Sequence, residues 1–167
     1  MRKTAIVIAA LVAGLIAGGA TLAGAAPKAK HHGGRTLKVY AATAPNGIRP
    51  IPVDPGKFGL GDRVALNDIL RTHKGGKQIG RDGGACVTVR VIDAATATGV
   101  LECEVTFSLP GGDIATQALN TLDKGAFSGV QKGAITGGTG KYRGATGELS
   151  LRFLSPDEVN ATFHLAR

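Results

Sequence analysis

The sequence predicts an all-β domain, and three observations lead to that class. Apolar and polar residues alternate with a period of two in short runs, which is the pattern of a half-buried strand. Turn residues separate these runs, in a chain that holds 26 glycines and 7 prolines. Beyond the N-terminal leader, no stretch shows the sustained 3.6-residue periodicity of a helix. Short strands at this spacing predict a β-sandwich or a β-barrel, and periodicity alone does not separate the two.

Each expected strand is bounded by turn residues. The first precedes Pro45-Asn46-Gly47 and three further prolines, which predict a long surface loop, because proline disfavours both helix and central strand. The third is interrupted by Gly83-Gly84, where we expect a bulge. In chain order, the expected strands are residues 36–41, 62–72, 77–92, 100–109, 114–119, 127–135, 148–154 and 159–165.

Residues 1–26 have the features of a secretory signal peptide. Arg2 and Lys3 precede an apolar run, and Ala23-Gly24-Ala25 offers small residues for cleavage. The run is too short and too rich in alanine and glycine for a membrane span, although an uncleaved anchor is the alternative. Residues 27–36 form a basic lead-in, expected to be disordered or loosely attached, before one domain over residues 37–167. We therefore expect a secreted or cell-envelope protein with no stable membrane insertion after cleavage.

The formal charge of +8 allows binding to anionic surfaces or acidic polymers. Nucleic acid is not an expected partner, because the chain has no basic strand interleaved with aromatic residues and no known nucleic-acid motif. We expect no metal site, since His73 and His164 are isolated from other ligand types. A serine triad is not expected either, because no G-x-S-x-G element occurs.

Two cysteines, Cys86 and Cys103, lie in the exported part, where disulfides can form. Each lies on an expected strand, and residues 93–99 form a plausible hairpin loop between them. A disulfide closing this 17-residue separation would stabilise the protein by about 3 kcal/mol. In that pairing Cys86 shares a face with the polar Thr88 and Arg90, whereas Cys103 shares one with the apolar Leu101 and Val105, and a bulge between the cysteines would reconcile the two faces. Two free thiols are the alternative.

Residues 134–149, AITGGTGKYRGATGEL, combine dense glycine with a single aromatic residue. The segment does not fit a P-loop, because Ile135 stands at the first glycine position and Tyr142 replaces Ser/Thr. It does not fit a dinucleotide fingerprint, because Arg143 stands where a third glycine belongs. Glycine instead allows positive φ and close approach of neighbouring chain, and Tyr142 could plug the end of a core.

The same segment resembles the GG-[Ser/Thr]-G-x-[Phe/Tyr]-x-G-A-x-G element of the allene oxide cyclase and dirigent-like barrels. Three further motifs resemble this family in consistent order across residues 37–165. They are Leu60-Gly61-Asp62-Arg63-Val64, residues 80–86 (a G-x-x-x-G-x-C step) and residues 112–117. The resemblance implies a closed, eight-stranded antiparallel β-barrel whose lumen holds side chains or one small ligand. It also implies a homodimer or homotrimer and no cofactor.

The cyclases bind a fatty-acid epoxide inside the barrel and use a glutamate, asparagines and an ordered water. Their V-Y-E-x-N motif appears here as residues 39–43, with Ala41 at the glutamate position and Thr43 at the asparagine. Their F-T-N motif appears as residues 66–68, with Asp68 at the asparagine position. Without the glutamate, cyclisation of an allene oxide is not the expected activity.

Asp68 is the candidate catalytic residue, because burial in a lumen would raise the pKa of its carboxyl and fit it for acid–base chemistry. The alternative is that Asp68 faces solvent, or pairs with Arg63 or Arg81 in a structural ion pair. Tyr40 and Gln117 are further candidates for ligand binding and could equally be ordinary strand residues.

The resemblance and the residues together predict a secreted barrel that binds a small apolar or phenolic ligand. Such a protein could steer cyclisation, isomerisation or coupling of the ligand by shape, which needs positioning more than strong acids. The alternative is a non-catalytic extracellular or cell-envelope binding protein whose lumen is filled with side chains. The open volume of the lumen discriminates between these two functions.

Overall fold

A computed structural model describes residues 34–166, and the predicted signal peptide and most of the basic lead-in lie outside the described residues. This part of the chain is built almost entirely from strands. They are β1 (Arg35–Ile51), β2 (Arg63–Arg71), β3 (Gln78–Asp93), β4 (Thr98–Leu109), β5 (Gly112–Asp123), β6 (Ala126–Phe127), β7 (Val130–Gly138), β8 (Gly147–Ser155) and β9 (Glu158–Leu165), with a short 3₁₀ helix η1 (Gly140–Tyr142) before β8.

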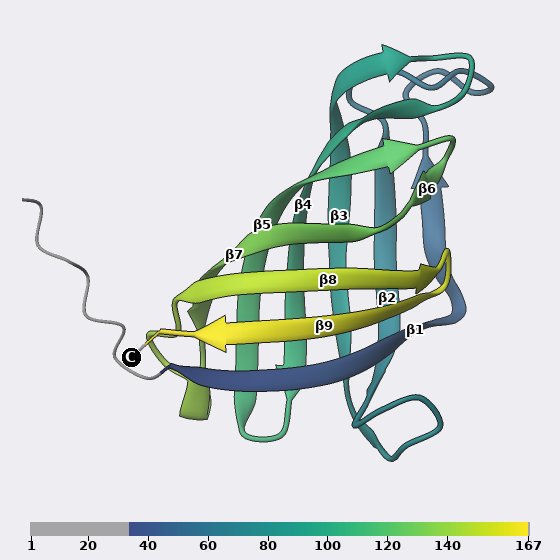
Figure 1. The fold of residues 1–167 in the computed structure, drawn as a ribbon. Coiled ribbons are helices and arrows are strands. Elements are labelled where there is room, and N and C mark those ends of the chain that lie inside the picture. The colour runs from purple at the N-terminus through teal and green to yellow at the C-terminus, as the bar shows by residue number, and fades with distance from the viewer. Residues whose placement is uncertain (1–33, 167) are drawn as a thin grey trace, which may run out of the picture. The chain divides into compact units, whose positions relative to one another are not determined.

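The strands close into a barrel. Their order is β4-β3-β2-β1-β9-β8-β7-β5-β6, and the additional pairing of β4 with β5 joins the two ends of the sheet. Every pairing is antiparallel. Because β6 has two residues and pairs only with the end of β5, eight long strands form the cylinder, which confirms the predicted closed eight-stranded barrel. In Figure 1, β8, β9 and β1 cross the front of the barrel and β2 to β5 run behind them.

One half of the lumen is filled with apolar side chains. Phe107 and Phe163 meet edge to face there, with ring centroids 4.9 Å apart. Tyr142, on η1, is buried within the same cluster and closes this end of the barrel, which confirms its predicted place at the end of a core. The cluster consists of Val39, Ala41, Leu70, Phe107, Leu109, Ile114, Ile135, Tyr142, Leu149, Ala161, Phe163 and Leu165.

Thr139 ties η1 to the start of β5. The Asp113 N–H donates to Thr139 Oγ1 at 2.9 Å, and the same hydroxyl donates to Asp113 Oδ2 at 3.3 Å. We expect Thr139→Val to lower the free energy of unfolding by about 1 kcal/mol, because it removes both bonds from an exposed site. Urea denaturation measures this, with Thr136→Val on the exposed face of β7 as the control. Equal effects of the two substitutions would contradict the prediction.

The first strand is longer than the sequence predicts. The expected loop begins later than predicted, since β1 continues through Pro45-Asn46-Gly47 to Ile51, and only residues 52–62 form the loop. The register with β2 shifts between Thr43 and Ile48, and Asn46 has a φ of 58° within this irregularity. Pairing with β9 ends at Ala42, so the later part of β1 is paired on one side only, where proline is tolerated in a sheet.

The expected bulge at Gly83-Gly84 is wrong. The pairing of β3 with β4 is regular from Arg81 to Thr88, and the shift comes after Thr88. Glycine is required at position 84 for another reason: a Cβ atom there would collide with the Glu104 carbonyl of β4.

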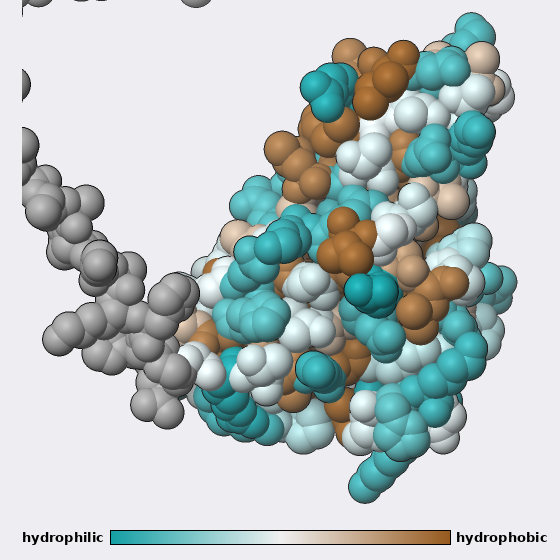
Figure 2. Space-filling model, in the orientation of Figure 1, coloured by the Kyte–Doolittle hydropathy of each residue, from teal (hydrophilic) through white to brown (hydrophobic). Residues whose placement is uncertain are grey.

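The outer surface facing the viewer in Figure 2 is mostly hydrophilic, and its apolar residues lie in separate small groups. Val53, Leu119 and Leu60 are the most exposed large apolar residues, at 70%, 66% and 64%. Scattered apolar residues of this kind are usual on protein surfaces. In the described part of the chain, no helix has the length and apolar character that crossing a membrane requires.

Candidate functional site in the barrel lumen

The other half of the lumen is open. An inner cavity of about 80 Å³ lies between the strands, and an outer pocket of about 250 Å³ adjoins it. The two share four lining residues, Ile48, Leu66, Phe127 and Pro156. Together they reach the lower end of the roughly 300–1,000 Å³ typical of small-molecule sites.

The mouth loop between β1 and β2 is held by the aspartate of the Leu-Gly-Asp motif. Asp62 accepts hydrogen bonds from the N–H groups of Val53 and Gly59, each at 2.8 Å. This loop places Phe58 and Pro52 against the outer pocket. The motif therefore shapes the entrance to the lumen.

A pair of carboxyl groups forms one end of the inner cavity. A hairpin centred on the Gly75-Gly76 turn brings Asp68 of β2 and Asp82 of β3 onto neighbouring positions, and both side chains line the cavity. The Asp68 N–H donates to Asp82 Oδ1 at 2.8 Å. Asp82 is 6% exposed, and Asp68 is half-buried opposite Thr43 of β1. Asp157, in the turn between β8 and β9, lines the same end.

This environment favours the protonated form of both acids. Burial raises the pKa of the Asp68 carboxyl, the nearby Asp157 carboxylate adds to that, and a hydrogen bond to Thr43 opposes it. Burial together with the Asp68 charge raises the pKa of Asp82 to about 7, against the opposing hydrogen bond from the Asp68 N–H. Two carboxyl groups this close titrate as a pair, so they can exchange a proton near neutral pH.

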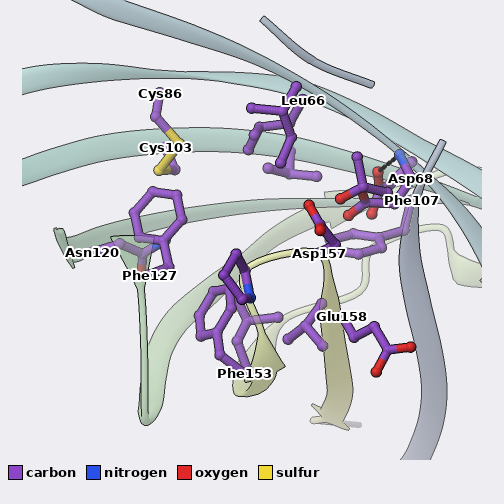
Figure 3. Close-up of a pocket in the computed structure, with 17 residues that line it drawn as sticks. Leu66, Asp68, Cys86, Cys103, Phe107, Asn120, Phe127, Phe153, Asp157 and Glu158 are labelled. Carbon is purple, nitrogen blue, oxygen red and sulfur yellow. Dashed lines mark hydrogen bonds between the residues drawn. A yellow bond between two sulfur atoms is a disulfide. The ribbon is translucent and has the colours of Figure 1, made fainter. Parts of the chain in front are cut away.

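The opposite end of the inner cavity is lined by an amide, a disulfide and aromatic rings. Figure 3 shows Asn120 beside Phe127 and near the Cys86–Cys103 bond, away from Asp68 and Asp157. Asn120 is 4% exposed, and its Oδ1 has no hydrogen-bond partner among the described residues. Buried polar atoms are rarely left unpaired in this way, so a ligand or a water that donates a hydrogen bond fits this atom.

The disulfide prediction is confirmed, since Cys86 and Cys103 are bonded and directly opposed in the ladder. A bulge does lie between the cysteines, between Thr88 and Arg90, but Cys86 and Thr88 already share a face with Cys103 and Leu101 because they are directly opposite them. The cavity side of β3 therefore carries Cys86 and Thr88, both buried, whereas Val89 is 48% exposed.

Of the three predicted site residues, the structure places only Asp68 in the lumen cavity. Asp68 lines the lumen cavity, and within residues 34–166 no ion pair joins it to Arg63 or Arg81. Gln117 is exposed on the outer face of β5 and donates to Glu102 Oε1 at 2.7 Å. Tyr40 is buried but does not line the cavity.

Tyr40 lies on the outside of β1, because it alternates with Val39 and Ala41, which belong to the lumen core. It lines a depression on the outer surface with His73 and Lys74. Burial raises the pKa of the Tyr40 hydroxyl, and the Glu158 carboxylate adds to that.

Sequence reasoning missed Asp82 and Asn120. A signal for Asp82 was present, because a hairpin centred on Gly75 places residue 68 opposite residue 82, as the flanking pairs Leu66–Gly84 and Ile69–Arg81 show. Asn120 has a weaker signal. It lies an even number of positions from Ile114 and Thr116 on β5, so it shares the inward face of the strand with them. Across residues 34–166 there is no group of three or more His, Cys, Asp or Glu side chains placed to hold a metal ion.

The fold and the site together define a closed antiparallel β-barrel with an open half-lumen, which has a carboxyl pair at one end and an aromatic lining. Comparison with known proteins gives the family. The sequence model described as "Allene oxide cyclase barrel like domain" matches residues 51–165, and the chain belongs to this family.

Solved structures with the same fold include three whose names describe small-molecule chemistry. A pyocyanin demethylase is 28% identical, with a TM-score of 0.66 over 79% of this chain and 100% of that one. The pterocarpan synthase dirigent protein GePTS1 is 21% identical, with a TM-score of 0.60 over 78% of this chain and 82% of that one. The Diels–Alderase AbmU from Streptomyces koyangensis is 15% identical, with a TM-score of 0.57 over 81% and 71%. The last two likenesses establish the fold alone.

Proposed function

We propose that this protein is secreted, binds a small apolar or phenolic ligand in its lumen and steers the cyclisation, isomerisation or coupling of that ligand. One observation carries the proposal: the open half of the lumen ends at a buried pair of carboxyl groups, Asp68 and Asp82. A lumen packed with side chains would instead favour the non-catalytic alternative. The 28% identity to a pyocyanin demethylase, a protein named for acting on a small molecule, also supports this function.

In this proposal the apolar side chains that line the cavity bind the ligand, and the carboxyl pair transfers a proton. Phe127 and Phe153 stack with ring centroids 5.6 Å apart and offer an apolar wall to a planar ligand. Asp68 is the acid–base group, because it is half-buried and reaches the cavity. Asp82 is a positioning residue that accepts the Asp68 N–H and shares the proton of the pair. Such a site accelerates a reaction by fixing the reacting atoms and by transferring a proton at neutral pH.

Secretion has separate support. The leader has the composition of a signal peptide, and the disulfide inside the barrel is of a kind that persists in oxidising compartments outside the cytosol.

Filling the cavity tests lumen binding. We expect Val105→Phe to raise the dissociation constant for 1-naphthol, a small apolar phenol, by about tenfold or more, because Val105 lines the inner cavity and one extra ring occupies its volume. Titration calorimetry measures this, and Val89→Phe on the outer face of β3 is the matched control.

Two results would overturn the proposal. One is failure of the unmodified protein to bind 1-naphthol together with the absence of any small molecule in a native mass spectrum of the protein purified from its host. The other is equal 1-naphthol affinity in the Val105→Phe and Val89→Phe variants, which would place the binding site outside the lumen.

A further inference from the structure

The charge inside the lumen is opposite to that of the chain as a whole. The formal charge is +8, yet the titratable side chains that line the inner cavity are all acidic: Asp68, Asp82, Asp157 and Glu158. Lys74 Nζ lies 2.8 Å from Glu158 Oε2, and this ion pair neutralises the Glu158 carboxylate. Within residues 34–166 no ion pair reaches any of the three aspartates. The three aspartates therefore have no basic partner among the described residues. Each of them carries either an unpaired negative charge or a proton.

A second feature of the same cavity points to a ligand. The Oδ1 of Asn120, buried at the opposite end, has no partner among the described residues and can accept a hydrogen bond. Aromatic rings lie at both ends. Figure 3 shows Phe107 on the side of Asp68 and Asp157, and Phe127 and Phe153 nearer Asn120.

We infer that the ligand of this lumen is a cationic aromatic molecule whose positive charge lies at the Asp68–Asp82 end. This inference rests on the proposed function and names the ligand class for the same site. The aspartates supply a counter-charge in a partly enclosed cavity where Asp82 is buried, and aromatic faces attract cations. A ring substituent that donates a hydrogen bond would reach Asn120 at the far end.

Because the acids in the cavity can be protonated, the affinity for a cation is expected to depend on pH. The groups that face the cation are Asp68 from β2, Asp82 from β3, Asp157 from the β8–β9 turn and Glu158 from β9 with Lys74 beside it. β1 contributes only the neutral Thr43 at this point. Burial and the Asp68 charge keep a proton on Asp82 up to a pKa of about 7, and burial also raises the pKa of Asp68, so a cation must displace a proton on binding. Its affinity therefore rises with pH through about 7, whereas the affinity of a neutral isostere stays constant.

Two isosteric probes test this on the unmodified protein. At pH 8, we expect 1-methylquinolinium to bind about tenfold more tightly than 1-methylnaphthalene, which has the same shape and no charge. At pH 5.5 the ratio should fall toward one. Titration calorimetry in two buffers of different ionisation enthalpy should also show proton release on binding of the cation only.

Variants assign the effect to the acid pair. We expect Asp82→Asn to remove most of the charge preference, measured as the ratio of the 1-methylquinolinium and 1-methylnaphthalene affinities within the variant. The control is Glu104→Gln, which removes a carboxylate from the outer face of β4 and should change neither affinity.

The outcomes separate this inference from the proposed function. If 1-methylnaphthalene binds as tightly as 1-methylquinolinium at pH 8, the cationic class is overturned and lumen binding stands. If the preference for the cation persists in Asp82→Asn at full strength and at pH 5.5, the acid pair is not its source and the inference fails. If neither probe binds, the inference fails, and the proposed function is decided separately by the 1-naphthol titration and the native mass spectrum.

Discussion

Replacing both Cys86 and Cys103 with alanine is expected to lower the free energy of unfolding by about 3 kcal/mol. The bond closes a 17-residue separation, and the chain entropy that it removes from the unfolded state corresponds to about that value. The two residues are directly opposed on β3 and β4, so the folded ladder does not have to shift to accommodate the bond. Urea denaturation followed by circular dichroism measures the change.

A control separates the bond from the packing of its sulfur atoms. Both cysteines are buried, at 0% and 3% exposure, so the alanine variant also loses contacts in the small cluster around Leu101. The unmodified protein unfolded in the presence of dithiothreitol retains both sulfur atoms and lacks only the bond. Equal stability of the oxidised and reduced proteins would contradict the entropic argument, even if the double alanine variant is destabilised.

Much of the fold could be predicted because alternation and turn residues are local properties. The hairpin that joins β3 and β4 is an example: residues 93–99 separate two alternating runs, which places Cys86 opposite Cys103. Alternation shows which residues share a face, but it does not show which face turns inward when both carry apolar residues. On β5, Ile114 and Leu119 lie on opposite faces, and the pattern left the orientation of Gln117 undecided.

The open half of the lumen depends on contacts between distant strands, and the sequence carries little information on those. Asp68 was found through one motif, whereas Asp157 reaches the same cavity from the turn between the last two strands. The Thr43 N–H donates to the Asp157 carbonyl at 2.9 Å, which fixes that turn against β1. Likewise, β1 continues past Pro45 because β2 pairs with it there, a tertiary effect that overrides the local preference of proline for a loop.

The buried acid at position 82 is expected to make the protein less stable as pH rises from about 4 to about 7. The folded protein keeps Asp82 protonated up to a pKa of about 7, whereas in the unfolded chain the carboxyl ionises near its usual value of 3.8. Between these pH values the folded state binds the additional proton, so raising the pH removes stability. The loss amounts to about 4 kcal/mol in all, since the pKa differs by about three units and each unit corresponds to about 1.4 kcal/mol. The pKa of Asp68 is raised as well and contributes in the same direction.

Asp82→Asn isolates this effect. The amide retains an oxygen that accepts the Asp68 N–H and carries no charge, so it imitates the protonated acid at every pH. We expect the variant to come close to the unmodified protein at pH 4, to be more stable by about 4 kcal/mol at pH 8, and to have a shallower pH profile that retains the slope contributed by Asp68. Urea denaturation at half-unit pH steps measures both proteins, and Asp123→Asn, at an exposed position at the end of β5, should leave the slope unchanged. A profile for the unmodified protein that rises toward pH 7 would mean that Asp82 is ionised in the folded barrel. The carboxyl pair would then already hold its charge before any cation binds, and the proton release expected on binding would be absent.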